Sequence, residues 1–178
     1  DHDPYLHNNG HEPWRPVSIF RTTQTHLLQV RPWLPDAIGH ITYVANGMAD
    51  LGVFLPIYQG IKSFPKAYQI GDNHCSDGSA YWKFRKVMTL AMTNYNVYAP
   101  LVKETYAKLE AENDQRQKEF EAKYLAIYKD SPMEAQDMLQ HFNDTILIHA
   151  LEVADKLTLE LFTRLTEETM KNYMFHGA

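Results

Sequence analysis

A run of six polar residues, RTTQTH at positions 21–26, stands inside a β-like stretch that extends from Val17 to Arg31. Successive side chains of a strand point to opposite faces of the sheet. The alternation predicts two sets on opposite faces: Arg21, Thr23 and Thr25 on one, and Thr22, Gln24 and His26 on the other. If either face is buried, these donors and acceptors need partners. Such a row is costly in a core, so the stretch is a candidate wall of a binding or catalytic site.

Arg21 is the residue of this stretch that most needs a partner if it is buried. A guanidinium keeps its charge when it is buried, so a buried Arg21 would need a carboxylate, a thiolate or a ligand as its partner. Two interpretations stay open for Arg21, a structural ion pair and a role in an active site. His26 also has two, a hydrogen-bonded structural histidine and a residue that contacts a ligand.

Nine histidines raise the question of a metal site. Three of them, His2, His7 and His11, lie among acidic residues near the N-terminus, but neither an HEXXH motif nor paired CxxC motifs are present. His141 and His149 are two helical turns apart, too far to share a small ion. We therefore expect solvated polar residues here, with no metal and no cofactor.

The single cysteine, Cys75, follows His74 in a stretch without clear periodicity. Neighbouring loop residues rarely face one another, and a catalytic Cys–His pair is normally joined in space instead of in sequence. An inert cysteine is therefore favoured over a thiol nucleophile. One cysteine also excludes an internal disulfide framework and favours a reducing compartment, so we expect a cytoplasmic protein.

The composition is that of a globular domain, with 178 residues, 44% hydrophobic and 22% charged. The formal charge is −5, and acidic and basic residues are mixed along the chain. No basic stripe indicates nucleic-acid binding, and no apolar run approaches the roughly 20 residues of a membrane span. We expect neither a nucleic acid nor a membrane among the partners.

Proline usage divides the chain near residue 78, because seven of the nine prolines precede that point. Residues 1–78 are expected to form strands and loops. After a loop over 1–16, one long strand or two joined strands are predicted over 17–31, followed by strands at 40–45 and 53–58. A turn is predicted at Asn46-Gly47, and an irregular connection over 59–78. Pro56 favours an edge strand or a bulge for the third of these.

Residues 79–178 are expected to be helical. One helix is predicted from Ser79 toward Tyr98, with a break or kink at Pro100, and a second over 101–129. The third begins with Ser131 as N-cap, Pro132 and Glu134, and continues to about Tyr173. The last two form an antiparallel hairpin whose apolar stripes need a sheet, or another chain, to cover them. The sequence thus predicts a single α+β domain over residues 1–178.

The polar run at 21–26 resembles the core motif of the C69 dipeptidases, cysteine peptidases of the N-terminal nucleophile (Ntn) hydrolase superfamily. Further segments in family-like order extend the resemblance over most of the chain. They are Arg31-Pro32 with Leu34-Pro35, Ile38-Gly39, residues 54–58 (FLPIY) with Gly60-Ile61, and residues 79–85 (SAYWKFR). Several ordered motifs are more specific than one motif alone.

The resemblance implies an αββα sandwich, two stacked antiparallel sheets with helices outside, of which this chain would be the C-terminal portion. It also implies a thiol protease with a cysteine nucleophile at the mature N-terminus, whose α-amino group, or a water held by it, serves as the base. This sequence begins with Asp1, and Cys75 is internal and does not match that nucleophile. We expect a truncated form or a proteolytic fragment, with the nucleophile on residues outside it.

Related Ntn amide hydrolases place an arginine beside the nucleophile. The resemblance therefore implies Arg21 as the catalytic arginine, which steadies the thiolate or the developing oxyanion, with Thr22, Thr23 and His26 as substrate contacts. The expected function is the C-terminal part of a dipeptidase, inactive without the missing N-terminal portion. The alternative is a non-catalytic interaction or oligomerisation module built on the helical hairpin. A homo-oligomer is compatible with both.

Overall fold

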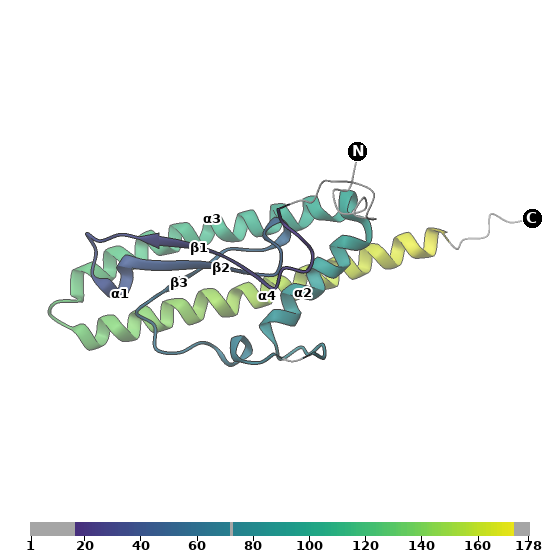
Figure 1. Cartoon of the computed structure of the whole chain (residues 1–178). Helices are drawn as coiled ribbons and strands as arrows, with labels where there is room; N and C mark the ends of the chain where they lie inside the picture. Colours follow the sequence, from purple (N-terminus) through teal and green to yellow (C-terminus); the bar gives the residue numbers. More distant parts are fainter. Residues whose placement is uncertain (1–16, 72, 173–178) are drawn as a thin grey trace, which may run out of the picture.

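The computed structural model describes residues 17–71 and 73–172, so the loop expected over 1–16 lies outside the described residues (Figure 1). The strands are β1 (Gln24–Val30), β2 (His40–Asn46) and β3 (Leu55–Tyr58). The α-helices are α1 (Asp36–Gly39), α2 (Ala80–Ala91), α3 (Tyr95–Ile127) and α4 (Pro132–Asn172), and 3₁₀ turns span Ala49–Leu51, Lys66–Gln69 and Met92–Asn94. A small antiparallel sheet followed by long helices confirms the predicted α+β class.

The first strand is shorter than predicted. Residues 17–23 form no strand, because the chain turns where the Thr22 N–H donates to the Ile19 carbonyl at 3.0 Å. The carbonyl of Thr23 then accepts a bond from the Gly47 N–H at 2.8 Å. Half of the polar run therefore lies before β1, and the prediction that strand structure begins at residue 17 was wrong.

The sheet has the order β1-β2-β3, with both neighbouring pairs antiparallel. The second strand, predicted over 40–45, is confirmed and extends to Asn46. The third begins at Leu55 instead of 53, because the Phe54 N–H donates to the Glu110 carboxylate of α3 at 2.7 Å and so contributes nothing to the ladder. The turn predicted at Asn46-Gly47 is present, with Gly47 at a φ of 99°.

The outer edge of β3 is closed by one side chain of α4. The Tyr58 N–H donates to Asn143 Oδ1 at 3.4 Å, and Asn143 Nδ2 donates to the Pro56 carbonyl at 2.8 Å. Asn143 is fully buried, so its amide takes the place of a neighbouring strand. The backbone groups of residues 56 and 58 both point to the outer edge of β3, away from β2. Proline has no N–H to donate, and at position 56 that missing N–H would point to the outer edge. The hydrogen bonds between β2 and β3 are therefore unaffected. The edge position predicted from Pro56 is confirmed within the described sheet.

The helices break at Asn94 and not at Pro100. α2 ends at Ala91, and Asn94 adopts a non-helical φ of −151° and ψ of 78°, with its side-chain amide 3.3 Å from Glu168. Pro100 lies inside α3, near its beginning. The turn between α3 and α4 is where the sequence predicts it, since Asp130 and Ser131 both donate to the Ile127 carbonyl. The predicted helical hairpin is confirmed.

Two apolar clusters join the helices to the sheet. The larger one packs α2, α3 and the C-terminal half of α4 beneath residues 48–55, and the smaller one packs α1, β2 and β3 onto the opposite end of the α3–α4 hairpin. Figure 1 shows the sheet lying along the two long helices, with α2 beside α4. The predicted stripe of α4 is buried or half-buried throughout, at Leu139, Phe142, Ile146, Ala150, Val153, Leu157 and Leu161.

Asn143→Leu should lower the free energy of unfolding by about 2–4 kcal/mol, because it keeps the side-chain volume but leaves the Tyr58 N–H and the Pro56 carbonyl buried without partners. Urea denaturation followed by circular dichroism measures this loss.

Asn113→Leu on α3 is the matched control. Asn113 is 1% exposed, and neither of its amide atoms has a hydrogen-bond partner among the described residues. Its replacement should be neutral or stabilising. Equal losses in the two variants would contradict the role assigned to Asn143.

Candidate active site

The polar run 21–26 crosses from a turn into the exposed edge strand. Arg21, Thr23 and His26 are exposed, and Thr22 is half-buried. Within the described ranges, the side chain of Arg21 forms no hydrogen bond and no ion pair. The structural ion pair considered for Arg21 is therefore absent from that part of the chain. Its guanidinium is available to a ligand or to a segment outside these residues.

Two threonines of the run, Thr22 and Thr25, line a surface hollow of about 410 Å³. Thr22 and Thr25 form one side of it, and Ser18 and Asp50 lie with them. Gln24 lines a different hollow of similar volume, over β2 and β3. The predicted grouping of Thr22 with Gln24 was wrong, because the turn before β1 interrupts the strand alternation and brings Thr22 beside Thr25.

The backbone of the run is tied to the turn after β2. The Gly47 N–H donates to the Thr23 carbonyl, and the Thr25 hydroxyl donates to the Gly47 carbonyl at 3.1 Å. A Cβ on Gly47 would lie 2.4 Å from Met88 Sδ of α2, so only glycine combines this contact with the φ of 99°. Gly47 thereby fixes the position of the run against α2.

Asp50 is held at the edge of the hollow by α3. The Tyr95 hydroxyl donates to its carboxylate, and Lys103 Nζ lies 2.8 Å from Asp50 Oδ1. Burial and the hydrogen bond to Asp50 raise the pKa of Tyr95, so this phenol stays protonated and remains a donor at neutral pH. Sequence reasoning missed this cluster, because 45 residues separate Asp50 from Tyr95 and no local spacing joins them.

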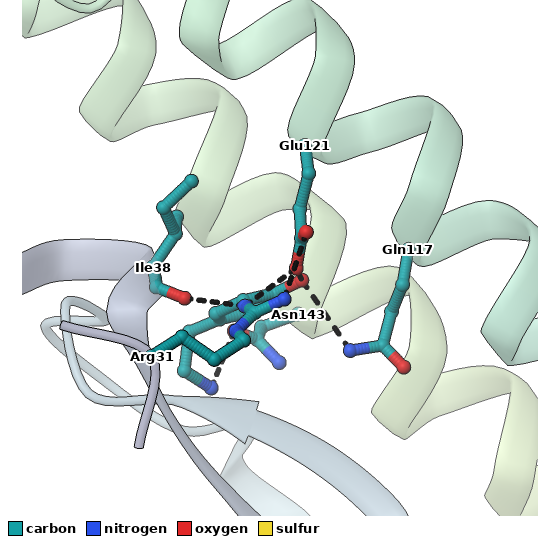
Figure 2. A network of polar contacts seen from close by, with 6 residues as sticks. Arg31, Ile38, Gln117, Glu121 and Asn143 are labelled. Carbon is teal, nitrogen blue, oxygen red and sulfur yellow. Dashed lines mark hydrogen bonds and ion pairs between the residues drawn. The ribbon is translucent and has the colours of Figure 1, made fainter. Parts of the chain in front are cut away.

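Among the described residues, Arg31 and not Arg21 is the half-buried arginine of β1 and its ends that pairs with a carboxylate. Its guanidinium forms two bonds with the Glu121 carboxylate, at 2.9 and 2.7 Å, and a third with the Ile38 carbonyl at 2.6 Å (Figure 2). The Tyr58 hydroxyl donates to Glu121 Oε1 at 2.5 Å, and Gln117 donates to the Tyr58 oxygen at 3.3 Å. Burial alone would lower the pKa of Arg31, but the bonds to Glu121 raise it on balance. The requirement stated for Arg21 thus applies to Arg31, which fastens the end of β1 to α3.

Within the described residues, Cys75 and the histidines form neither a second catalytic site nor a metal site. Cys75 is exposed and lines a separate surface hollow with Trp82 and Lys86. His149 lies 3.5 Å from Glu152 and 3.9 Å from Glu112, on the outside of the hairpin. Within residues 17–71 and 73–172, no group of three or more His, Cys, Asp or Glu residues could hold a metal ion. The N-terminal histidines lie outside these ranges.

The family model for peptidase family C69 matches residues 1–108, more than half of the chain. The chain belongs to peptidase family C69. The match covers the polar run with Arg21, the sheet, α2 and the beginning of α3. The resemblance inferred from the ordered motifs is confirmed.

Curated relatives of this C69 chain are named as dipeptidases. A probable dipeptidase of Salmonella dublin is 53% identical over 79 residues, which is 44% of this chain and 17% of that protein. Dipeptidase A of Lactobacillus helveticus is 28% identical over 151 residues, 83% of this chain and 31% of that protein. A probable dipeptidase B of Lactococcus lactis is 28% identical over 103 residues, 56% of this chain and 22% of that protein. The chain therefore spans less than a third of the length of these relatives.

Tyrosine ionisation sets a pH dependence for this C69 fold. Burial raises the pKa of Tyr58, and its bond to Glu121 raises it further. Burial also raises the pKa of Tyr68 and Tyr106. In the unfolded chain tyrosine ionises near its ordinary pKa of about 10. The folded state holds these protons more tightly, so their contribution to stability is complete below about pH 10 and is lost as the pH rises above it.

We expect the urea midpoint, followed by helical circular dichroism, to fall as the pH rises past about 10. Tyr58→Phe should lower stability at neutral pH but flatten the alkaline slope, and Tyr128→Phe, which keeps the three phenols, is the control. An alkaline slope of the urea midpoint that is equally steep in Tyr58→Phe and in Tyr128→Phe would contradict this linkage.

Proposed function

We propose that this chain forms one wall of a dipeptidase active site, and that another portion of the same protein supplies the cysteine nucleophile. Membership of peptidase family C69 and the names of the relatives support dipeptides as the substrate class. The sole cysteine of this chain, Cys75, is exposed and lines a hollow other than the one at Thr22 and Thr25. In this proposal, the cysteine that attacks a dipeptide beside Arg21 comes from residues outside this sequence.

The free edge of β1 supports the contribution of that other portion. No described strand pairs with the outer side of β1, and its side chains Leu27, Leu28 and Val30 are 59%, 71% and 61% exposed. Leu27 points to one face of the sheet, and Leu28 and Val30 to the other. An unpaired edge with apolar residues on both faces favours burial by further structure. A strand beside β1 and a second sheet over it would complete the αββα sandwich that the resemblance implies.

The observation that carries the proposal is the exposed, unpaired state of Arg21 within the described residues, beside the hollow residue Thr22. A guanidinium stays charged at any working pH. Opposite a thiolate it would stabilise the negative sulfur, and in the tetrahedral intermediate it would stabilise the oxyanion. The Thr22 hydroxyl in the hollow, and the exposed Thr23 and His26, are then the proposed contacts to the dipeptide. The proposed chemistry needs no metal or cofactor.

A reducing compartment suits this chemistry. A catalytic thiol must stay reduced, and the exposed free Cys75 supports an environment such as the cytoplasm. None of the helices in the described residues is long and apolar enough to cross a membrane.

An interaction module is the second candidate, and one feature of α4 favours it. Its outer surface exposes large apolar side chains, with Leu159 at 68%, Phe162 at 60% and Met170 at 65%. Residues of this kind are enriched where chains associate, so α4 supports a homo-oligomer. This role is compatible with the dipeptidase proposal, but alone it gives Arg21 no function.

This chain by itself should not hydrolyse dipeptides, because the proposed nucleophile is outside it. Incubating the purified chain with a panel of dipeptides and measuring released amino acids tests this. Cys75→Ala should leave the result unchanged. Substantial turnover that disappears in Cys75→Ala would overturn the assignment of the nucleophile.

Arg21→Ala in the protein extended to the length of its relatives should lower kcat by about 10²–10³-fold, the usual loss when an oxyanion donor is removed. Arg21→Lys should recover part of it, because the charge stays while the fork of donors is lost. Arg164→Ala is the control, since Arg164 forms a half-exposed pair with Glu160 on α4. An unchanged kcat in Arg21→Ala would favour the interaction module.

A further inference from the structure

The side chain of Arg85 reaches back from α2 to the residue that precedes Arg21. Its Nη1 donates to the Phe20 carbonyl at 2.5 Å, and its guanidinium carbon lies 3.9 Å from the centre of the Phe20 ring. A guanidinium that bonds a carbonyl and also covers the attached aromatic ring holds both the backbone and the side chain of one residue. The 65 residues between the partners make this a tertiary contact.

Arg85 differs from the other cations of α2. Lys83 pairs with Asp155 of α4 at 2.5 Å, and Lys86 pairs with Asp77 in the preceding connection. Arg85 forms no ion pair with a carboxylate of the described residues, and its strong contacts all go to Phe20. Arg85 is the last residue of the motif at 79–85. Its contacts with Phe20 give this residue a structural role that the dipeptidase proposal does not include.

The bonded carbonyl belongs to the peptide unit between Phe20 and Arg21, so fixing it restricts the backbone from which the Arg21 side chain starts. One turn further along α2, Met88 packs under Gly47, and Gly47 bonds Thr23 and Thr25. Residues 85 and 88 lie on the same face of the helix. α2 therefore supports the polar run at both ends, at Phe20 through Arg85 and at Gly47 through Met88.

We propose that Arg85 is a positioning residue of the C69 site, which holds the Phe20–Arg21 peptide so that the Arg21 guanidinium starts from a fixed place. This rests on the proposed function of Arg21. Arg85 acts on the reaction only through Arg21 and touches no substrate. Its loss should therefore matter for kcat only while Arg21 is present.

The first arm of the test uses this chain alone, with Arg85→Met, Arg85→Lys and the control Lys86→Met. Hydrogen exchange of the Thr22 and Gly47 amides should accelerate by ~10-fold or more in Arg85→Met, because their local structure opens more readily. Arg85→Lys should recover little, since an ammonium lacks the planar fork that both bonds the carbonyl and stacks on the ring. Lys86→Met should leave both amides as in the wild type. Unchanged exchange in Arg85→Met would overturn the inference and leave the proposed function untouched.

The second arm measures kcat and KM in the protein extended to the length of its relatives. Arg85→Met should lower kcat by ~10–100-fold, an effect of misplacing a catalytic group, with a smaller change in KM. Adding Arg85→Met to Arg21→Ala should cause no further loss, because the residues act as one unit. If the kcat of the double variant fell by the product of the two single losses, the positioning role of Arg85 would be overturned. If Arg21→Ala alone costs nothing, the proposed function fails, and the exchange arm then decides whether Arg85 holds the run.

Discussion

Tyr58 joins the sheet to both long helices. Its N–H bonds Asn143 of α4, its hydroxyl bonds Glu121 of α3, and its ring packs against Phe120 and Phe142 at centroid distances of 5.5 and 6.0 Å. It is fully buried, so each of these polar groups would be costly without its partner. One side chain and its backbone thus connect β3 to both arms of the hairpin.

The other two strands are connected to the helices through β3, one after the other. β2 pairs with β3, β1 pairs with β2, and the end of β1 returns to the same Glu121 through Arg31. The polar run at 21–26 stands at the other end of β1, away from Arg31. Its support comes instead from α2 and from the turn at Gly47. The structural arginine and the proposed catalytic arginine therefore lie at opposite ends of one strand, and each has its own supporting helix.

The unpaired edge of β1 lies on the side where the active site is proposed. Arg21 and the hollow at Thr22 lie next to an unpaired strand edge, and the relatives of this chain are more than three times as long as the segments they share with it. A wall of a site that is completed by another portion of the protein would have this form, with polar groups and apolar strand residues left uncovered together. The helical side, in contrast, has its own buried core and needs no further layer over its stripe.

Local patterns were enough to predict the α+β class, the position of the second strand, the hairpin turn at Asp130 and Ser131, and the apolar stripes of the long helices. These follow from periodicity, proline placement and helix capping, which act over a few residues. The ordered motifs also identified the C69 family. Local patterns failed at residues 17–23, where alternation favours a strand but a hydrogen bond to Gly47, 24 positions beyond Thr23, helps to hold a turn. They failed again at Pro100, because the side chain of Asn94 is held by Glu168, far along the chain.

The candidate site also combines features that the sequence determined with features that only the tertiary structure decided. The sequence by itself determined that six polar residues follow one another at positions 21–26, and that Arg21 would need a partner if it were buried. Only the tertiary structure decided that the half-buried Arg31, and not Arg21, pairs with a carboxylate. It also decided that Thr22 lies beside Thr25 and that Arg85 reaches Phe20. The physical reason is that charge pairing and burial depend on distance in space, and the residues concerned are separated by 65 to 90 positions in the two long-range contacts.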